Sequence, residues 1–226
     1  RTGHRRNLAG LDCELIEGSI EDAELVRRAM AGVTYVHHLA ALVSVPESMS
    51  APRVANRLNI DGTLNVLDAA RDAGVRKVVY SSTSAVYGQV DRPMHSESHL
   101  PAPASPYAIA KLAGEHYMAL YAEAYGAPTV TLRYFNVYGP RQDPNSPYAA
   151  AVAIFAARAR ANQPITIFGD GEQTRDFVFV EDVARANILA AESGTGLFNV
   201  ACGGRITIND LAREIVSLSG SSSPIE

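Results

Sequence analysis

A group of hydroxyl side chains and one lysine have the types and spacing for proton transfer. Thr83 ends the run Ser81-Ser82-Thr83, and Tyr107 lies four residues before Lys111. Residues four apart share one face of a helix, and an ammonium beside a phenol lowers the ordinary tyrosine pKa of about 10. The sequence therefore predicts that Tyr107 is a general base near neutral pH, with Thr83 holding the reacting oxygen.

The residues around Tyr107 place it in the first turn of a helix. Ser105 is a candidate N-cap and Pro106 takes the first helical position. The helix dipole favours an anion at this end, which adds to the effect of Lys111. Because a tyrosine and a lysine four apart are common by chance, the prediction depends on the whole arrangement.

Short apolar runs alternate with helical patterns before these residues and after them. We expect strands at residues 13–17, 33–39, 77–81 and 129–133, and helices at 22–30, 59–73 and 106–125. This alternation predicts an α/β fold, a doubly wound parallel sheet with helices on both faces.

The pattern changes after Gly139. We expect a loop at 140–147, helices at 149–161, 182–192 and 207–219, and a strand at 197–200. Two further strands, 165–168 and 176–180, are expected to flank a turn at Gly169-Asp170-Gly171.

Composition excludes several classes of protein. With 20 Lys and Arg against 24 Asp and Glu, the net charge of −4 argues against a nucleic-acid partner. The longest apolar stretch, 148–157, is too short to span a bilayer. We expect Cys13 and Cys202 to be buried free thiols, which favours a cytoplasmic location. His37 and His38 have no third ligand clustered with them, so no metal site is expected.

Four segments together resemble the motif series of the extended short-chain dehydrogenase/reductase family, the NAD-dependent epimerases and dehydratases. The nearest match is its UDP-hexose 4-epimerase branch. The segments are 79–88 (VYSSTSAVYG), 105–111 (SPYAIAK), 132–140 (LRYFNVYGP) and Gly169-Asp170-Gly171 followed by Arg175-Asp176. The resemblance implies a partial Rossmann-like NAD-binding domain, residues 1–137 and 176–195. It also implies a partial, smaller C-terminal substrate-binding lobe, residues 138–175 and 196–226.

The resemblance also implies roles for single residues. Thr83, Tyr107 and Lys111 would be catalytic. The NAD cofactor would be bound by Ser19, Ile20, Leu39, Ala40, Ala41, Asn59, Ser81, Ser82, Tyr107, Lys111, Tyr134 and Phe135. The UDP-sugar would be bound by Ser44, Thr83, Asn136, Ile165, Ile167, Phe168 and Arg175, and the planar Arg175 guanidinium suits the pyrophosphate. Helices 59–73 and 106–125 would pair in a homodimer.

The implied reaction is epimerisation at C4 of a UDP-sugar, either UDP-glucose and UDP-galactose or the N-acetylated pair, through a 4-keto intermediate. A nucleotide-sugar 4,6-dehydratase or decarboxylase is the alternative enzyme, but it needs an acid or base beside the catalytic Thr. Ser84 and Ala85 stand there and do neither job. A nucleotide-sugar or dinucleotide-binding protein without turnover is the non-enzymatic alternative.

Two features depart from the family pattern. The sequence contains no G-x-G-x-x-G or G-x-x-G-x-x-G motif, which would hold the dinucleotide pyrophosphate. Gly18-Ser19-Ile20 stands where the family often has Gly-Asp-Ile. We therefore expect a first βα unit and a strand to be missing, and the 226-residue chain alone to be poorly soluble and free of NAD.

Overall fold

The computed structural model describes residues 3–89, 94–144 and 151–226. The chain forms two compact units, which are described separately. The sheet unit comprises Glu14–Tyr134 and Ala184–Val200, and the small unit comprises Arg1–Cys13, Phe135–Val183 and Ala201–Glu226. Parts of two expected elements, the end of the loop 140–147 and the start of the helix 149–161, lie outside the described residues.

The sheet unit is built on a parallel sheet, as the sequence predicts. Its strands are β1 (Tyr35–His38), β2 (Lys77–Thr83), β3 (Thr129–Tyr134) and β7 (Gly196–Val200), in the order β1-β2-β3-β7. Each neighbouring pair is parallel. All residues of β2 except the last are buried, as expected for a β-branched strand covered on both faces.

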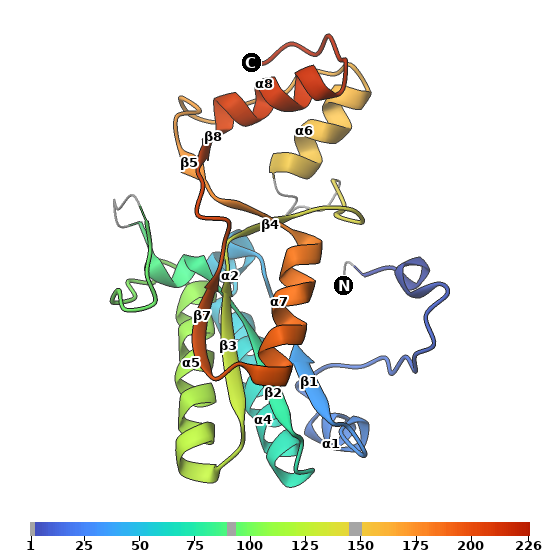
Figure 1. Cartoon of the computed structure of the whole chain (residues 1–226), viewed down its shortest axis with the longest axis vertical. Coiled ribbons are helices and arrows are strands. Elements are labelled where there is room, and N and C mark those ends of the chain that lie inside the picture. Colours follow the sequence, from blue (N-terminus) through green and yellow to red (C-terminus); the bar gives the residue numbers. More distant parts are fainter. Residues whose placement is uncertain (1–2, 90–93, 145–150) are drawn as a thin grey trace. The chain divides into compact units, whose positions relative to one another are not determined.

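Helices cover both faces of this sheet, which confirms the doubly wound prediction (Figure 1). On one face, Val78 and Tyr80 of β2 pack against α1 (Ala23–Ala29), α4 (Gly62–Asp72) and α5 (Pro106–Tyr125). On the other face, Val79 packs with Ala190 and Ala191 of α7 (Val180–Ser193). Successive β2 residues thus alternate between two cores, as the strand period of two requires.

The ends of α5 are set by the residues expected to set them. Ser105 Oγ accepts a hydrogen bond from the backbone N–H of Ala108 at 3.2 Å, and Pro106 opens the helix. Gly126 ends it in the left-handed region at φ 64°, where glycine has no Cβ to clash. The helix bounds Pro106–Tyr125 agree with the prediction.

The segment before α4 is irregular. It contains α2 (Val45–Ser50), α3 (Pro52–Asn56) and a π-helical turn, Arg57–Asp61, which leads into α4. The expected helix 59–73 therefore begins inside the π turn. Such turns are rare and frequently occur at functional sites.

In the part that the structure describes, the small unit has two short sheets and two helices around its own core. Strand β4 (Asn136–Tyr138) pairs in parallel with β6 (Phe177–Phe179), and β5 (Thr174–Arg175) pairs antiparallel with β8 (Ile206–Thr207). Helices α6 (Ala151–Arg160) and α8 (Ile208–Leu218) pack through the apolar residues Phe155, Ala159, Ile208, Leu211 and Ala212. Short 3₁₀ turns occur at Arg5–Leu8 and, in the sheet unit, at Ser84–Tyr87.

Two predicted strands, 13–17 and 165–168, and the predicted hairpin between 165–168 and 176–180 are wrong. Residues 13–17 form no strand, because this segment has no ladder partner, and Leu15 and Ile16 are exposed. The hairpin around Gly169-Asp170-Gly171 does not form: Ile165 makes a single bridge to Ile225, and β6 pairs with β4 instead.

Other expectations also change. Strand β7 belongs to the main sheet because it pairs with β3, although residues 196–226 were assigned to the smaller lobe. Cys13 and Cys202 are free thiols as expected, but both are exposed. No helix in the described part of the chain is long and apolar enough to cross a membrane.

Candidate active site

Polar side chains gather where β2 and β3 end. Ser82 is the register partner of Arg133, and Thr83 that of Tyr134, so the two strand ends lie side by side. The carboxyl edge of a parallel sheet is the usual ligand-binding edge in open α/β folds. The predicted Ser81-Ser82-Thr83 run therefore lies where a ligand site is expected.

Tyr107 lies in the first turn of α5 and is linked to Thr83. Its backbone N–H donates to Ser48 Oγ at 3.2 Å, and Thr83 Oγ1 accepts from the Ala85 N–H at 3.1 Å. Burial raises the pKa of Tyr107, and a side-chain hydrogen bond with Thr83 lowers it by less. The predicted depression of this pKa is thus wrong in sign, since removal of the phenol from water is the larger effect.

Lys111 is held against β2 by its own contacts. Its Nζ donates to the backbone carbonyl of Ser81 at 2.7 Å and lies 4.7 Å from the ring centre of Tyr80. Burial lowers the pKa of Lys111 to about 8, and the negative Glu115 opposes this shift. The ammonium is thus fixed against β2, and burial makes its proton easier to lose.

Ser81 and Tyr134 are joined on the opposite face of β2. Ser81 Oγ lies 3.0 Å from the Tyr134 hydroxyl, which lies 2.9 Å from Asn187 Oδ1 of α7. Burial raises the pKa of Tyr134, while its contacts with Ser81 and Asn187 lower it. These contacts orient two of the predicted cofactor residues.

Asn59, in the π turn, holds the loop that follows β1. Its Oδ1 accepts from the Leu42 N–H at 2.7 Å, and its Nδ2 donates to the Leu42 carbonyl at 2.9 Å. Leu39 is 56% exposed although it is apolar, and Ala40 is also exposed. A clamped loop with small and apolar exposed side chains at the end of a strand fits the flat surface of a dinucleotide.

His38 is buried beside this loop. Its Nε2 lies 2.9 Å from Thr63 Oγ1, and that hydroxyl donates to the Asn59 carbonyl at 2.7 Å. Because the Thr63 proton is already used, Nε2 of His38 must carry a proton and donate it. Burial, with a smaller effect of the Lys111 charge, lowers the pKa of His38 to about 3.

The other predicted residues of the sheet unit have mainly local contacts. Ser19 is exposed and accepts from the Glu21 N–H at 3.2 Å, whereas Ile20 packs on the core of α1 and α4. Ala41 is half-buried in the clamped loop. Ser44 is 2% exposed and caps α2 by accepting from the Glu47 N–H at 3.0 Å, so its role toward a substrate stays a prediction.

The small unit carries the remaining predicted substrate residues. Asn136 is half-buried and donates from Nδ2 to the Asp176 carbonyl at 3.0 Å, and Arg175 is exposed on β5. Ile165 is fully buried in the core, so its side chain has no free surface for a ligand. The predicted substrate residue Ile167 is half-buried, and Phe168 is 85% exposed. The predicted cofactor residue Phe135 also belongs to this unit and is half-buried.

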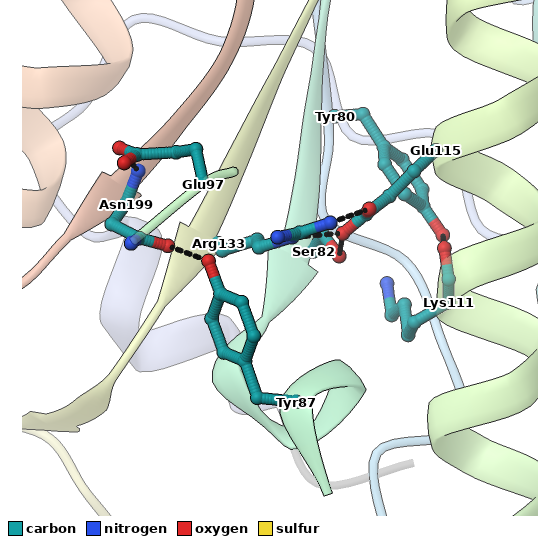
Figure 2. A network of polar contacts seen from close by, with 8 residues as sticks. All are labelled: Tyr80, Ser82, Tyr87, Glu97, Lys111, Glu115, Arg133 and Asn199. Carbon is teal, nitrogen blue, oxygen red and sulfur yellow. Dashed lines mark hydrogen bonds and ion pairs between the residues drawn. The ribbon is translucent and has the colours of Figure 1, made fainter. Parts of the chain in front are cut away.

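Sequence reasoning missed a buried ion pair at this site (Figure 2). Glu115 of α5 accepts from Arg133 Nε at 2.9 Å and from Arg133 Nη2 at 2.6 Å, and also from the Ser82 hydroxyl. The available signal was its spacing, because Tyr107, Lys111 and Glu115 recur every four residues on one helix face.

No metal-binding cluster of three or more His, Cys, Asp or Glu side chains occurs among the described residues. The chemical groups gathered here are instead a tyrosine, a threonine and a lysine at a sheet edge. Such groups are suited to proton transfer to and from a hydroxyl group.

Comparison with known proteins gives a consistent result. Residues 1–201 match the model of the NAD dependent epimerase/dehydratase family. A UDP-glucose 4-epimerase of Mycolicibacterium smegmatis is 40% identical over 92% of this chain and 67% of its own length. The chain therefore spans about two thirds of that relative.

Two solved structures are similar over nearly all of the chain. A UDP-N-acetylglucosamine 4-epimerase from Methanobrevibacter ruminantium, in complex with UDP-N-acetylmuramic acid, has a TM-score of 0.93 and 43% identity over 99% of this chain and 73% of its own. The Thermus thermophilus UDP-glucose 4-epimerase in complex with NAD has a TM-score of 0.93 and 39% identity, covering 100% of this chain and 75% of that one.

Proposed function

The chain belongs to the NAD dependent epimerase/dehydratase family, and on that premise we propose that it acts as an NAD-dependent UDP-sugar 4-epimerase. The observation that carries the proposal is the grouping of Thr83, Tyr107 and Lys111 at the carboxyl end of β2. The relatives named above are 4-epimerases of UDP-glucose and UDP-N-acetylglucosamine, one of them solved with NAD.

The residues of the sheet unit would hold the cofactor as follows. Leu39, Ala40 and Ala41 offer the apolar surface clamped by Asn59, and Lys111 offers a buried ammonium at the adjacent strand end. NAD supplies the hydride acceptor and donor for C4 of the sugar. The protein supplies binding, orientation and proton transfer.

The catalytic residues act on the O4 hydroxyl. Tyr107 must act as the phenolate, a form that burial disfavours and that the Thr83 hydrogen bond and the Lys111 charge would stabilise. In that form it would remove the O4 proton while C4 is oxidised, and return it when C4 is reduced on the other face. The Thr83 hydroxyl, which hydrogen-bonds with Tyr107, holds O4 beside the base. Lys111 stabilises the phenolate through its positive charge.

Residues beside Thr83 separate this reaction from dehydration or decarboxylation. Those reactions require a further acid or base next to the threonine, where this chain has Ser84 and Ala85. Neither side chain transfers a proton near neutral pH. Epimerisation needs only the base that removes and returns the O4 proton.

The proposal includes UDP-sugar contacts in the small unit. Asn136 would meet the phosphates, Arg175 would pair with the pyrophosphate, and Ile167 and Phe168 would border the uracil. Arg175 is exposed and lies on a two-residue strand, so its guanidinium has room to bind an anion.

A homodimer through α4 and α5 is a further part of the proposal. Leu67 is fully buried and Leu64 packs on the core, so these residues do not serve the interface. Ile109 and Leu120 of α5 are 54% and 46% exposed, and they offer the apolar surface instead. Such a contact between identical helices would be isologous.

We also place the enzyme in the cytoplasm. Cys13 and Cys202 are free and exposed thiols, which persist in a reducing compartment.

Replacement of Tyr107 by Phe tests the proposed function directly. In the full-length protein, Tyr107→Phe is expected to lower turnover by at least about two orders of magnitude, the usual size of a general-base contribution. Turnover is measured with UDP-glucose and UDP-N-acetylglucosamine side by side, and Tyr125→Phe, an exposed tyrosine at the other end of α5, is the control. Near wild-type turnover of Tyr107→Phe would remove this residue from the mechanism.

A further inference from the structure

Glu115 continues the row of ionisable residues on α5. Tyr107, Lys111 and Glu115 are spaced four apart, so they lie along one face of the helix. Glu115 is 6% exposed, and its carboxylate is held by both Arg133 donors and by the Ser82 hydroxyl. The proposed reaction uses Tyr107 and Lys111 but assigns nothing to Glu115.

The partners of Glu115 tie α5 to two strand ends at once. Ser82 and Arg133 are register partners on β2 and β3, and both donate to the same carboxylate of α5 (Figure 2). Arg133 also lies 4.7 Å over the Tyr87 ring. This arrangement fixes the helix that carries Lys111 against the strand whose Ser81 carbonyl accepts from Lys111.

An ion pair so deeply buried is not explained by stability alone. Removal of two charges from water costs free energy that their attraction repays only in part. Here Arg133 Nη1 has no hydrogen-bond partner among the described residues, which adds to the cost. A well-packed apolar pair would fill the same space without this penalty.

We propose that Glu115 is a positioning residue, which keeps the neighbouring Lys111 protonated and directed at the Ser81 carbonyl and thereby supports the base Tyr107. The inference rests on the proposed function of the same site. Ser82 and Arg133 hold the carboxylate in place.

The charges around Lys111 support this role of Glu115. Burial lowers the pKa of Lys111, and Glu115 is the charge that acts against this shift. Without the carboxylate, Lys111 would lose its proton at a lower pH, and the uncompensated Arg133 cation would add to that loss. A neutral Lys111 would no longer stabilise the Tyr107 phenolate.

Lysine labelled with ¹³C at Cε gives one NMR signal for each lysine of the full-length protein, and positions 77 and 111 are the two in this sequence. The signals of these two residues are assigned by their loss in Lys77→Arg and in Lys111→Arg. Lys77, whose Nζ donates to the Gly194 carbonyl at 2.6 Å at the start of β2, is the internal control for folding. The pH titration of the Lys111 signal reports its protonation without any need for turnover.

The decisive comparison is wild type against Glu115→Gln, which keeps the size of the side chain and removes its charge. We expect the midpoint of the Lys111 pH titration to fall by at least about half a pH unit. The Lys77 signal should be unchanged. Glu123→Gln, an exposed change on the same helix, should shift neither signal. An unchanged Lys111 midpoint in folded Glu115→Gln would overturn the proposal.

Two further variants complement Glu115→Gln: one retains the charge, and the other removes both buried charges. Glu115→Asp retains the charge but is one methylene shorter, so the Lys111 midpoint should stay closer to wild type than in Glu115→Gln. If Glu115→Gln does not fold, the double variant Glu115→Gln with Arg133→Gln removes both buried charges, a change that proteins often tolerate. In this double variant the midpoint of the Lys111 titration should fall by less than in Glu115→Gln. An unchanged midpoint in the double variant would also overturn the proposal.

Turnover provides a second readout. Glu115→Gln should lower kcat several-fold with little change in KM, and the acid limb of the kcat pH profile should move to higher pH. The base acts deprotonated, and loss of the Lys111 charge raises the pH at which that form appears. If Tyr107→Phe retained turnover, the proposed function would fail, whereas the NMR titration would still decide the role of Glu115.

Discussion

The protonation of the buried His38 is controlled by its surroundings. Its Nε2 donates to Thr63, whose hydroxyl donates to the Asn59 carbonyl, and Asn59 clamps the loop after β1. One neutral tautomer thus supports the proposed cofactor loop. A second proton would have to be carried in the buried interior, close to the charge of Lys111.

This arrangement predicts a loss of stability in acid. His38 takes up a proton at a pKa of about 3 in the folded protein, against 6.5 for the ordinary side chain. The unfolded chain therefore binds more protons between these values, and the free energy of unfolding falls as pH drops through this window, by up to about 1.4 kcal/mol per unit of pKa difference. Urea unfolding at several pH values measures this slope.

The matched variants are His38→Gln, which keeps a donor toward Thr63 but does not titrate, and His116→Gln at an exposed position of α5. The first should flatten the slope between pH 6.5 and about pH 4, and the second should leave it unchanged. An equal slope in wild type and His38→Gln would show that other groups cause the acid sensitivity.

At the scale of elements, α5 approaches β2 closely because Gly114 has no side chain. A Cβ at this position would lie 2.2 Å from the Tyr80 hydroxyl. Tyr80 is fully buried in the core shared by α1, α4 and α5, so it has little space into which to move. Gly114 thus sets the distance at which α5 presents Lys111 to the strand.

Gly114→Ala should therefore destabilise the protein despite the better helix propensity of alanine. Overpacking costs about 1–3 kcal/mol, whereas the gain in helix propensity is about 1 kcal/mol or less. Thermal and urea unfolding measure the net change. Ala119→Gly, at an exposed position of α5, isolates the propensity contribution. A clear gain in stability for Gly114→Ala would contradict the close packing against Tyr80.

The elements that could be predicted from the sequence are those with strong local signals. The bounds of α5 follow from Ser105, Pro106 and Gly126, and β2 from its run of β-branched residues. Residues 13–17 and 165–168 have the same kind of apolar run but form no strand, because a strand also needs a partner ladder. Which distant segments pair cannot be predicted from the sequence of one segment alone.

The residues of the candidate site could be predicted from the sequence only in part. Residue types and spacing identified Thr83, Tyr107 and Lys111, and the structure joins Thr83 to Tyr107 and Lys111 to Ser81. The direction of the Tyr107 pKa was wrong because it depends on burial, which spacing does not reveal. Glu115 was missed for a related reason, since its partner Arg133 lies on another element.

At the scale of the whole molecule, the exposed apolar side chains of α5 predict self-association. Leu120→Glu, which places a charge on this face, should convert the expected dimer to a monomer at micromolar concentration. Leu189→Glu, at a comparably exposed position of α7, should leave the mass unchanged. Sedimentation velocity or light scattering measures both. A monomeric wild-type protein would contradict the dimer, and so would a dimer that survives Leu120→Glu.

The central claim, epimerisation at C4 with the hydrogen returned to the same carbon, is tested most directly with a UDP-sugar that carries deuterium at C4. The full-length protein is incubated with UDP-glucose and with UDP-N-acetylglucosamine so labelled, and the products are analysed by NMR and mass spectrometry. The account predicts the C4 epimer with the deuterium retained at C4, because Tyr107 exchanges only the O4 proton. Loss of the deuterium to solvent, or formation of a dehydrated 4-keto product in place of the epimer, would contradict it.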